Sequence, residues 1–498
     1  MPQSPIHFGT SGWRAIIADE FTFSNVRLAV TAIAGHVRSR SKKPMIIVAH
    51  DTRFFSEEFT RAAAEVLDAN GIEVLVCDEP TPTPAVAVEI RRRKTAGAIN
   101  FTASHNPYPY HGLKYSGPDG APAMPEVTKD IEARAAKLAS RDFSEPAEAH
   151  SQRGKHFKTI SLREAYLSRL DELVRFDVIA KAAKNAKGNF SIVFDAVHGC
   201  GAGYVDSALA KHGISLTVIR ANRDVLYDGT GPDVTEENLA PLRKGVLDAR
   251  ANVGLATDGD ADRFGIIDAD GTWISPNHIL ALVYDYLVES RGWKMDAGRS
   301  VATSHMMDAV AKLYGKRIHQ TPVGFKYIGE LIEKDQIALG GEESAGMSIR
   351  GHVPEKDGIL ACLLVAEMMA ARGTTLSQQI SELFRRVGRE FWPIRTNLHL
   401  TEDVQAQTMA RLKQDYKTFL GRQVKSLDRT DGLKIEFEQG SWVLLRLSGT
   451  EPLLRVYTEA GSQKDSASLA EETRKWIFEK TDAEPKAVVV GKVKAKGR

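Results

Sequence analysis

The polar segment Thr-Ala-Ser-His-Asn-Pro (102–107) contains a serine, Ser104, whose position could support chemistry. The apolar run 96–101 before it predicts a buried strand, and Pro107 disfavours helix at Asn106. Ser104 is therefore expected in a loop at the carboxyl end of that strand, the edge at which open α/β sheets bind ligands. The alternative is an ordinary polar turn in which Ser104 and Asn106 bond their own backbone.

Three aspartates, Asp258, Asp260 and Asp262, alternate with small residues after another apolar run. Their carboxylates would repel one another within a single turn unless a cation lies between them. Ligands that are all oxygen favour a hard divalent ion such as Mg²⁺. An EF-hand is excluded, because the loop positions that require glycine and glutamate hold Arg263 and Ala269. Three exposed aspartates in a turn are the other interpretation, which the preceding apolar strand makes less favourable.

A third polar segment, Arg-Leu-Ser-Gly-Thr-Glu-Pro-Leu-Leu-Arg (446–455), predicts a phosphate-binding loop. Ser448 and Thr450 offer hydroxyls, and Gly449 allows backbone N–H groups to approach a ligand closely. Arg446 and Arg455 carry planar donors that suit bidentate phosphate binding. The alternative is a β-turn with exposed arginines, but so many donors around one glycine favour the phosphate site.

The elements that must position these residues repeat three times along the chain. Each repeat has a strand, a helix, a glycine that caps the helix and a second strand, which is the βαβ pattern. A short apolar strand then ends in an unusual loop, so three such loops could face one shared cleft. The predicted ranges are 46–49, 57–69 and 72–77, then 191–194, 204–211 and 214–219, then 300–303, 306–314 and 316–319, with added strands at 98–101, 253–256 and 337–339 and capping glycines Gly71, Gly213 and Gly315.

The last part of the chain follows a different pattern. Strands at 433–437, 442–447 and 453–457 are joined by short connections and followed by a helix at 465–479, which predicts an antiparallel α+β domain. A polar segment around 141–158 marks the first boundary. We expect an α/β protein with three similar mixed α/β domains followed by a fourth antiparallel α+β domain, at 1–155, 156–272, 273–389 and 390–498.

Composition limits the classes of function. The 498 residues include 66 Lys and Arg against 64 Asp and Glu, a net charge of +2, which argues against a nucleic-acid partner. Three scattered cysteines predict no disulfide framework or structural zinc site and favour a cytoplasmic location. The N-terminus has no signal-peptide pattern, and the most apolar stretch, 359–370, is interrupted by Glu367. This apolar stretch is therefore predicted to be a core helix, and no membrane partner is expected.

Taken together, the loops resemble those of the α-D-phosphohexomutases, whose best-known members are phosphoglucomutase and phosphomannomutase. The Ser104 loop, Asp-Gly-Asp-Ala-Asp-Arg (258–263), Gly-Glu-Glu-Ser (341–344) and Arg-Leu-Ser-Gly-Thr-Glu-Pro (446–452) occur in the order of that family. The resemblance runs from Gly-Thr-Ser-Gly-Trp-Arg (9–14) to Arg455. It implies four domains around a central cleft. It also implies interconversion of hexose 1-phosphate and hexose 6-phosphate, with glucose as the expected sugar, through a phosphoserine enzyme and a hexose 1,6-bisphosphate intermediate.

The resemblance also implies roles for single residues. Sugar phosphates are the expected partners, Mg²⁺ and the 1,6-bisphosphate the expected cofactors, and the chain is expected to be a monomer or dimer. Lys114 would act as general acid or base, and no role is implied for His111. The implied catalytic residues are Ser104, Lys114, Arg14, His105 and Arg263, the metal ligands are Ser104, Asp258, Asp260 and Asp262, and the substrate-binding residues are Glu342, Ser344, Lys326, Arg446, Ser448, Gly449, Thr450 and Arg455.

Alternative functions remain open from the sequence. A phosphomannomutase or dual-specificity mutase would share these loops, because glucose and mannose differ at carbon 2, whereas Glu342 and Ser344 are implied to contact the 3- and 4-hydroxyls. The Gly-Glu-Glu-Ser loop is similar to that of glucose-acting members rather than to the glutamine-containing loop of glucosamine mutases. A phosphatase would keep the serine and aspartates but transfer the phosphoryl group to water. A non-catalytic binding protein would lack the serine or an aspartate, and all are present here.

Overall fold

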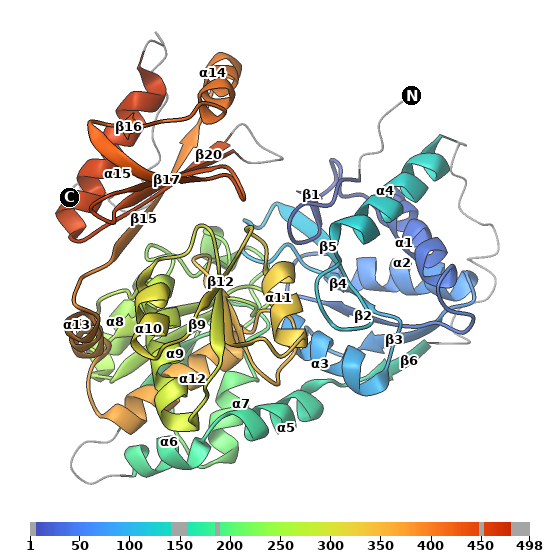
Figure 1. Ribbon diagram of the computed structural model, residues 1–498. Coiled ribbons are helices and arrows are strands. Elements are labelled where there is room, and N and C mark those ends of the chain that lie inside the picture. Colours follow the sequence, from blue (N-terminus) through green and yellow to red (C-terminus); the bar gives the residue numbers. More distant parts are fainter. Residues whose placement is uncertain (1–5, 141–156, 185–189, 448–452, 480–498) are drawn as a thin grey trace, which may run out of the picture. The chain divides into compact units, whose positions relative to one another are not determined.

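The structure is a computed structural model that describes residues 6–140, 157–184, 190–447 and 453–479 (Figure 1). It divides into two compact units. Unit 1 comprises Met1–Ile279 with Gly324–Leu376, and unit 2 comprises Leu280–Val323 with Ser377–Arg498. The chain therefore passes between the units three times, and the division runs through the third predicted domain.

The first sheet of unit 1 has six strands in the order β1-β5-β4-β2-β3-β6. The pairs β2–β3, β2–β4 and β3–β6 are parallel, whereas β5 runs antiparallel to both β4 and β1. β4 is the buried strand predicted before Ser104, and it occupies an inner position in the sheet. The strands are β1 (Trp13–Ile16), β2 (Met45–His50), β3 (Glu73–Cys77), β4 (Ala98–Phe101), β5 (Tyr110–Ser116) and β6 (Phe157–Ile160).

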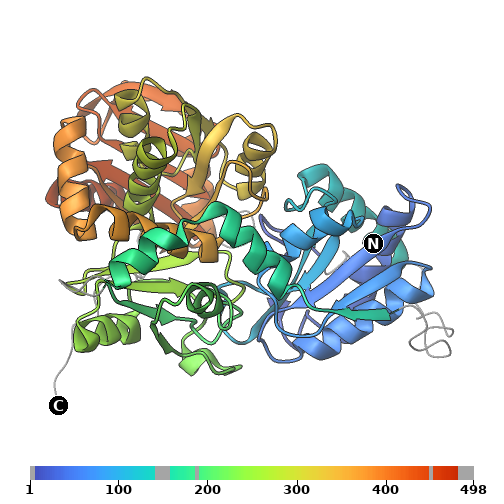
Figure 2. The same cartoon turned by 90° about the horizontal axis from the view of Figure 1, so that it is seen from below.

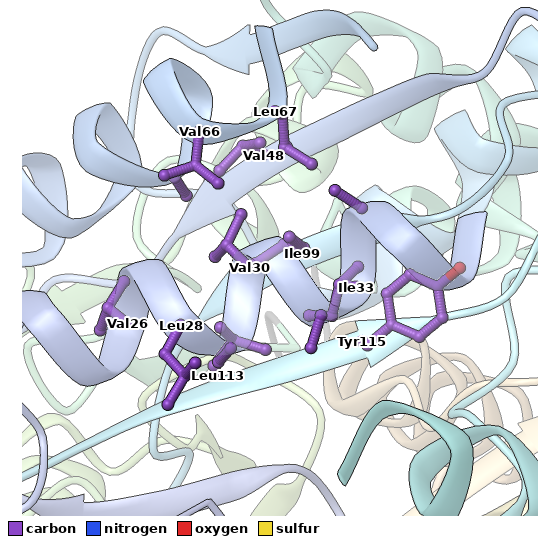
Figure 3. Close-up of a cluster of buried hydrophobic side chains, with 14 of the residues drawn as sticks. Val26, Leu28, Val30, Ile33, Val48, Val66, Leu67, Ile99, Leu113 and Tyr115 are labelled. Carbon is purple, nitrogen blue, oxygen red and sulfur yellow. The ribbon is translucent and has the colours of Figure 1, made fainter. Parts of the chain in front are cut away.

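Helices cover both faces of this sheet, with α1, α2 and α4 on one face and α3 on the other (Figure 1). Apolar side chains of α1 recur at helical spacing, and Val26, Val30 and Ile33 lie in one cluster with Val48 and Ile99 of the sheet (Figure 3). The helices are α1 (Phe23–Arg38), α2 (Ser56–Ala69), α3 (Thr83–Arg93) and α4 (Pro125–Ala139).

The second sheet of unit 1 has the order β10-β9-β7-β8, with only β10 antiparallel to its neighbour. Figure 2 shows α5 and α6, in teal-green, leading from the first sheet to the second. α12 packs against β9, β10 and α6 and is buried from Gly358 to Met369, so the predicted core helix is confirmed. The elements are α5 (Arg163–Leu173), α6 (Phe176–Ala183), β7 (Ile192–Asp195), α7 (Val205–Lys211), β8 (Thr217–Ile219), the 3-10 helix Tyr227–Gly229, α8 (Ala240–Ala249), β9 (Val253–Thr257), β10 (Phe264–Asp268) and α12 (Gly358–Arg372).

A third set of strands repeats this mixed pairing. β11 and β12 pair in parallel in unit 2, and β13 and β14 pair antiparallel in unit 1. The strand predicted at 300–303 is found at 296–300, so it begins four residues earlier and ends three residues earlier. Arg299 is buried in this strand because Asp308 and Gln320 accept hydrogen bonds from its guanidinium. The elements are α9 (Pro276–Arg291), β11 (Asp296–Ser300), α10 (Met306–Leu313), β12 (Ile318–Thr321), α11 (Phe325–Glu333), β13 (Ile337–Glu342) and β14 (Gly346–Ile349).

The last sheet lies in unit 2 and has six antiparallel strands in the order β15-β20-β19-β18-β17-β16. α15 packs on β20 and β15, and its Leu469 and Ile477 belong to the same hydrophobic core as the buried apolar residues of this sheet. The predicted fold class, three mixed α/β domains followed by an antiparallel α+β domain, is confirmed. The elements are α13 (Leu376–Val387), β15 (Trp392–His399), α14 (Glu402–Leu412), β16 (Thr418–Phe419), β17 (Arg422–Asp428), β18 (Leu433–Phe437), β19 (Trp442–Leu447), β20 (Leu453–Ala460) and α15 (Gln463–Phe478).

Among the helices that the structure describes, none is by itself both long and apolar enough to cross a membrane. α12 and α13 reach that length and composition only when they are joined as a bent pair.

Candidate functional site

Ser104 lies in the loop between β4 and β5, as predicted, and is only 1% exposed. Its backbone has a left-handed φ of +53°, an uncommon conformation for a residue other than glycine. The Ser104 amide donates to Thr102 Oγ1 at 2.8 Å, which is the local bond that an ordinary turn would make. Its hydroxyl, however, donates to Asp258 Oδ2 at 2.8 Å and lies 3.3 Å from His105 Nδ1. The turn interpretation does not account for this long-range bond.

The three aspartates of the loop after β9 are all buried, and one carboxylate oxygen from each lies within 4.8 Å of the other two. Asp258 Oδ1 accepts a hydrogen bond from the Arg263 amide at 3.0 Å. Oδ1 of Asp260 and Oδ1 of Asp262 are buried and have no hydrogen-bond partner within the described residues. Buried oxygens of this kind normally have a partner, and three close carboxylates are a donor set for a hard cation. The residues present therefore fit Mg²⁺.

The electrostatics of the aspartate loop are uneven. Burial raises the pKa of Asp258 well above its usual range, and the charges of Asp262 and Asp260 raise it further. Burial acts in the same direction on Asp262, but Lys114, Lys356 and Arg263 outweigh it and hold the pKa of that carboxyl well below its usual range. The loop thus concentrates negative charge that nearby cations partly balance, and a divalent ion would favour the charged form of all three carboxyls.

Two lysines contact these carboxylates directly. Lys114, on β5, places Nζ 2.5 Å from Asp260 Oδ2 and 2.7 Å from Asp262 Oδ2. Burial lowers its pKa, but the two aspartates outweigh burial and the net shift is upward, so Lys114 is held in its charged form. Lys356 Nζ lies 2.9 Å from Asp262 Oδ2 and 3.2 Å from Glu355 Oε1, and this side chain is also buried.

Sequence reasoning missed Lys356. The triplet Glu-Lys-Asp (355–357) precedes an apolar helix, and Asp357 accepts a hydrogen bond from the Leu360 amide as a typical N-cap. A charged triplet at that position is usually solvated, which is why it gave no sign of a site. The burial of the whole triplet, which only the fold establishes, distinguishes it from an ordinary helix start.

Two arginines lie near the same loops. Arg14, on β1, donates from Nη1 to Asn106 Oδ1 at 2.7 Å, which ties it to the Ser104 loop. Burial, and then the charge of Arg263, lowers the pKa of Arg14 to about 10. Arg263 Nε lies 3.9 Å from Asp262 Oδ1, and although burial lowers its pKa, acidic neighbours led by Asp233 raise it overall.

The residues predicted to hold the sugar also belong to unit 1. Glu342 ends β13, which extends three residues beyond the predicted strand, and its Oε1 accepts a hydrogen bond from the Gly324 amide at 2.7 Å. Burial, then Glu343, raises the pKa of Glu342 to about 7, whereas the charges of Lys356 and Arg263 act in the opposite direction. Glu342 is therefore within electrostatic range of Arg263 and of Lys356, the lysine that contacts Asp262. Ser344 is partly buried in the turn after β13, and Lys326 lies at the start of α11, where burial lowers its pKa.

The predicted phosphate loop belongs to unit 2. Arg446 on β19 and Arg455 on β20 are directly opposite in the antiparallel register. Like charges in that arrangement destabilise a strand pair unless they are compensated. Asp431 supplies part of this compensation, with Oδ2 2.9 Å from Arg446 Nε. Ser448, Gly449 and Thr450, which connect the two strands, lie outside the described residues.

Comparison with known proteins assigns most of the chain to one family. Residues 5–142, 164–271 and 275–387 match alpha/beta/alpha domains I, II and III of phosphoglucomutase/phosphomannomutase, and residues 396–475 match the C-terminal domain of the same family. The four matches occur in the order that the sequence motifs predict.

Individual relatives cover nearly the whole chain. The phosphoglucomutase/phosphomannomutase of Thermococcus kodakarensis is 30% identical, over 93% of this chain and 96% of the relative. The probable phosphoglucosamine mutase of Methanosphaera stadtmanae is 28% identical, over 94% and 97%. The crystal structure of a putative phosphomannomutase from Thermus thermophilus is similar with a TM-score of 0.82 at 32% identity, covering 95% of this chain and 99% of that one.

Proposed function

Because this chain belongs to the phosphoglucomutase/phosphomannomutase family of intramolecular phosphotransferases, we propose that it interconverts hexose 1-phosphate and hexose 6-phosphate, with glucose as the preferred sugar. The observation that carries the proposal is the 2.8 Å hydrogen bond from Ser104 Oγ to Asp258 Oδ2. It joins a buried hydroxyl that could carry a phosphoryl group to a carboxylate of the aspartate cluster.

Ser104 is the proposed phosphoryl carrier. The reaction begins with Ser104 phosphorylated. A free hydroxyl of the bound hexose phosphate attacks the phosphorus of this phosphoserine, the bond between that phosphorus and Ser104 Oγ breaks, and the product is a hexose 1,6-bisphosphate. After the bisphosphate has turned over in the site, Ser104 Oγ attacks its other phosphoryl group, and the isomeric monophosphate leaves. The sum is isomerisation with no net use of water, because the serine ends phosphorylated as it began.

Charge and proton handling fall to the residues around Ser104. Asp258, Asp260 and Asp262, together with the phosphorylated Ser104, would hold Mg²⁺, which neutralises charge on the phosphoryl oxygens when it is bound. Lys114 is the proposed acid and base. Because two aspartates keep it protonated, it is suited first to giving a proton to the leaving Ser104 oxygen and then to recovering one from the sugar hydroxyl.

The remaining predicted residues are assigned to the substrate. We assign Glu342, Ser344 and Lys326 to the sugar, and Arg14, His105 and Arg263 to the charge around the transferred phosphoryl group. The phosphate that does not react is assigned to the segment from Arg446 to Arg455, with Ser448, Gly449 and Thr450. The directly opposed Arg446 and Arg455 support this assignment, because an anion would relieve their repulsion. The domain limits 1–155, 156–272, 273–389 and 390–498 are part of the same proposal.

The sugar is the point that needs a direct test, because relatives of similar identity are named for different sugars. A coupled assay on purified protein would compare glucose 1-phosphate, mannose 1-phosphate and glucosamine 1-phosphate, and intact-mass analysis would follow phosphorylation. We expect the highest kcat/KM for glucose 1-phosphate and loss of both turnover and phosphorylation in Ser104→Ala. A higher value for mannose or glucosamine 1-phosphate would overturn the sugar preference. Full activity in Ser104→Ala would overturn the mechanism, and stoichiometric release of inorganic phosphate would identify a phosphatase.

A further inference from the structure

Arg53 follows β2 and is 1% exposed, although it carries a charge. Its Nη2 donates to the main-chain carbonyls of Ser104 and Asn106, each at 2.6 Å. Its Nη1 donates to the carbonyls of Pro107 at 3.1 Å and Tyr110 at 3.0 Å. One guanidinium therefore binds four carbonyl oxygens, three in the loop that contains the proposed phosphoryl carrier Ser104 and one at the start of β5.

Arg53 is itself held in place from two sides. Asp51 Oδ2 accepts from Arg53 Nε at 3.1 Å, and Asp51 Oδ1 accepts from the Arg53 amide at 2.9 Å. The ring of Tyr227 lies against the guanidinium, 5.4 Å from its centre. Thr52, between these residues, donates to the carbonyl of His198 at 2.8 Å. The guanidinium is thus oriented by its own loop and by the part of the chain that contains the second sheet.

The direction of the Ser104 carbonyl matters for the distance between the two reacting loops. That carbonyl lies against the aspartate loop, because a Cβ added to Gly259 would be only 2.7 Å from it. Turning it would rotate the peptide plane between Ser104 and His105 and would disturb the position of Ser104, whose hydroxyl donates to Asp258. Arg53 opposes this turn, and Asn106, which it also binds, is the residue that accepts a hydrogen bond from Arg14.

We propose that Arg53 is a positioning residue that fixes the Ser104 loop in the geometry for phosphoryl transfer. The inference rests on the proposed function, since it takes Ser104 as the phosphoryl carrier. The fork of donors is essential, because the donors of a lysine radiate from one nitrogen and cannot span four carbonyls in a fixed plane. A merely structural Arg53 would contribute to stability without a specific effect on the chemical step.

The test compares Arg53→Lys with Arg243→Lys in the full chain. Arg243 is a matched control, since it also donates to a loop carbonyl, that of Gly271 at 2.8 Å, and to a carboxylate, that of Glu236 at 2.7 Å. We expect kcat to fall about 100-fold in Arg53→Lys, as for a misplacement of roughly 1 Å, with little change in KM. Hydrogen exchange should accelerate at 102–112 and remain unchanged elsewhere. Arg243→Lys should keep its kcat and its exchange pattern.

Three results would overturn the inference. They are a folded Arg53→Lys with kcat close to that of the native chain, a fall in kcat no larger than the unfolded fraction explains, and faster exchange spread evenly over unit 1. If Arg53→Lys does not fold, Asp51→Asn replaces the carboxylate that accepts from Arg53 Nε, the Arg53 amide and the Ser56 hydroxyl but leaves the guanidinium in place. It should show a smaller change of the same kind, and an unchanged kcat there would also overturn the inference. Ser104→Ala separates the two proposals. An active Ser104→Ala refutes the proposed function, whereas an inactive Ser104→Ala beside a fully active Arg53→Lys refutes only the role of Arg53.

Discussion

Replacing Gly259 by alanine should slow phosphoryl transfer without removing any group that takes part in it. Gly259 lies between Asp258 and Asp260, and a Cβ there would be 2.7 Å from the Ser104 carbonyl oxygen and 2.9 Å from Pro232 Cγ. Ordinary contact begins near 3.4 Å, so one side must retreat by about 0.7 Å. Gly259 is restrained, because its amide donates to the Pro232 carbonyl at 3.0 Å and its carbonyl accepts from the Cys200 amide at 2.9 Å. Because Arg53 restrains the Ser104 loop as well, the spacing between the two loops must increase.

This displacement sets the size of the expected effect. A misplacement of 1 Å costs on the order of 100-fold in rate, so about 0.7 Å should lower kcat by about 10- to 100-fold, or about 1.4–2.7 kcal/mol of activation free energy. The assay is steady-state turnover of glucose 1-phosphate with saturating Mg²⁺ and 1,6-bisphosphate. Thermal melting would be followed alongside, since an overpacked methyl costs roughly 1–3 kcal/mol of stability.

The control is Gly461→Ala, because a Cβ at Gly461 has no neighbour within 4 Å in the described residues. It should change neither kcat nor the melting temperature appreciably. A folded Gly259→Ala enzyme with native kcat would refute the reasoning, because it would mean that the spacing of the Ser104 and aspartate loops does not limit the reaction. A fall in kcat that is matched by loss of folded protein would refute it equally.

Three further predictions concern the metal, the second phosphate and the pH dependence of stability. Asp258→Asn should lower activity by orders of magnitude while the fold survives. A chelator should inactivate the native chain reversibly. Full activity in the presence of chelator would exclude a catalytic metal at this loop. Arg455→Ala should lower kcat/KM about 10- to 100-fold in both directions of the reaction, because it removes a charge-assisted contact worth about 1.5–3 kcal/mol. Ser104 should still be phosphorylated at a high concentration of the 1,6-bisphosphate. A binding defect in one direction only would contradict a shared phosphate site. Lys434 is fully buried, and burial, then Arg299, lowers its pKa from 10.5 to about 7. The unfolded chain therefore binds more protons between these values, and the free energy of unfolding should rise from pH 7 toward pH 10 by roughly 1.4 kcal/mol per pH unit. Below pH 7 both states are protonated and this contribution to the slope vanishes. Urea midpoints of the native chain and Lys434→Met measure it, and equal slopes in the two would contradict the prediction.

Local signals made much of the fold predictable. The capping glycines Gly71, Gly213 and Gly315 have left-handed φ values of +72°, +71° and +66°, and each ends a predicted helix. The conformation they need is set by neighbouring residues alone, so the sequence is sufficient. β5 was not predicted, because the run 110–116 mixes polar and apolar residues, and its place depends on antiparallel pairing with β1 and β4.

The candidate site divides in the same way. Ser104 and the three aspartates follow apolar strands directly, so the sequence alone indicates where they lie. Arg53 and Lys356 could not be found from the sequence, because a charged residue is normally exposed. Besides a neighbour in the sequence, each has partners that only folding brings close, four main-chain carbonyls of residues 104–110 for Arg53 and Asp262 for Lys356. A buried charge with distant partners leaves no local pattern.

The position of α12 constrains how the chain can be completed on the ribosome. α12 closes the second sheet, with Cys362 Sγ 3.3 Å from the Ala256 carbonyl and a Glu367 carboxylate that accepts from the Arg175 amide. Between β10 and α12 the ribosome must first make Leu280–Val323, which belongs to the other unit. At a synthesis rate of roughly 5–20 residues per second, β9 and β10 are without α12 for about 5–20 s, and an apolar face of the sheet is uncovered during that time. A fragment that ends near 272 would lack the helix that covers β9 and β10, so unit 1 is complete only in chains that extend through Leu376.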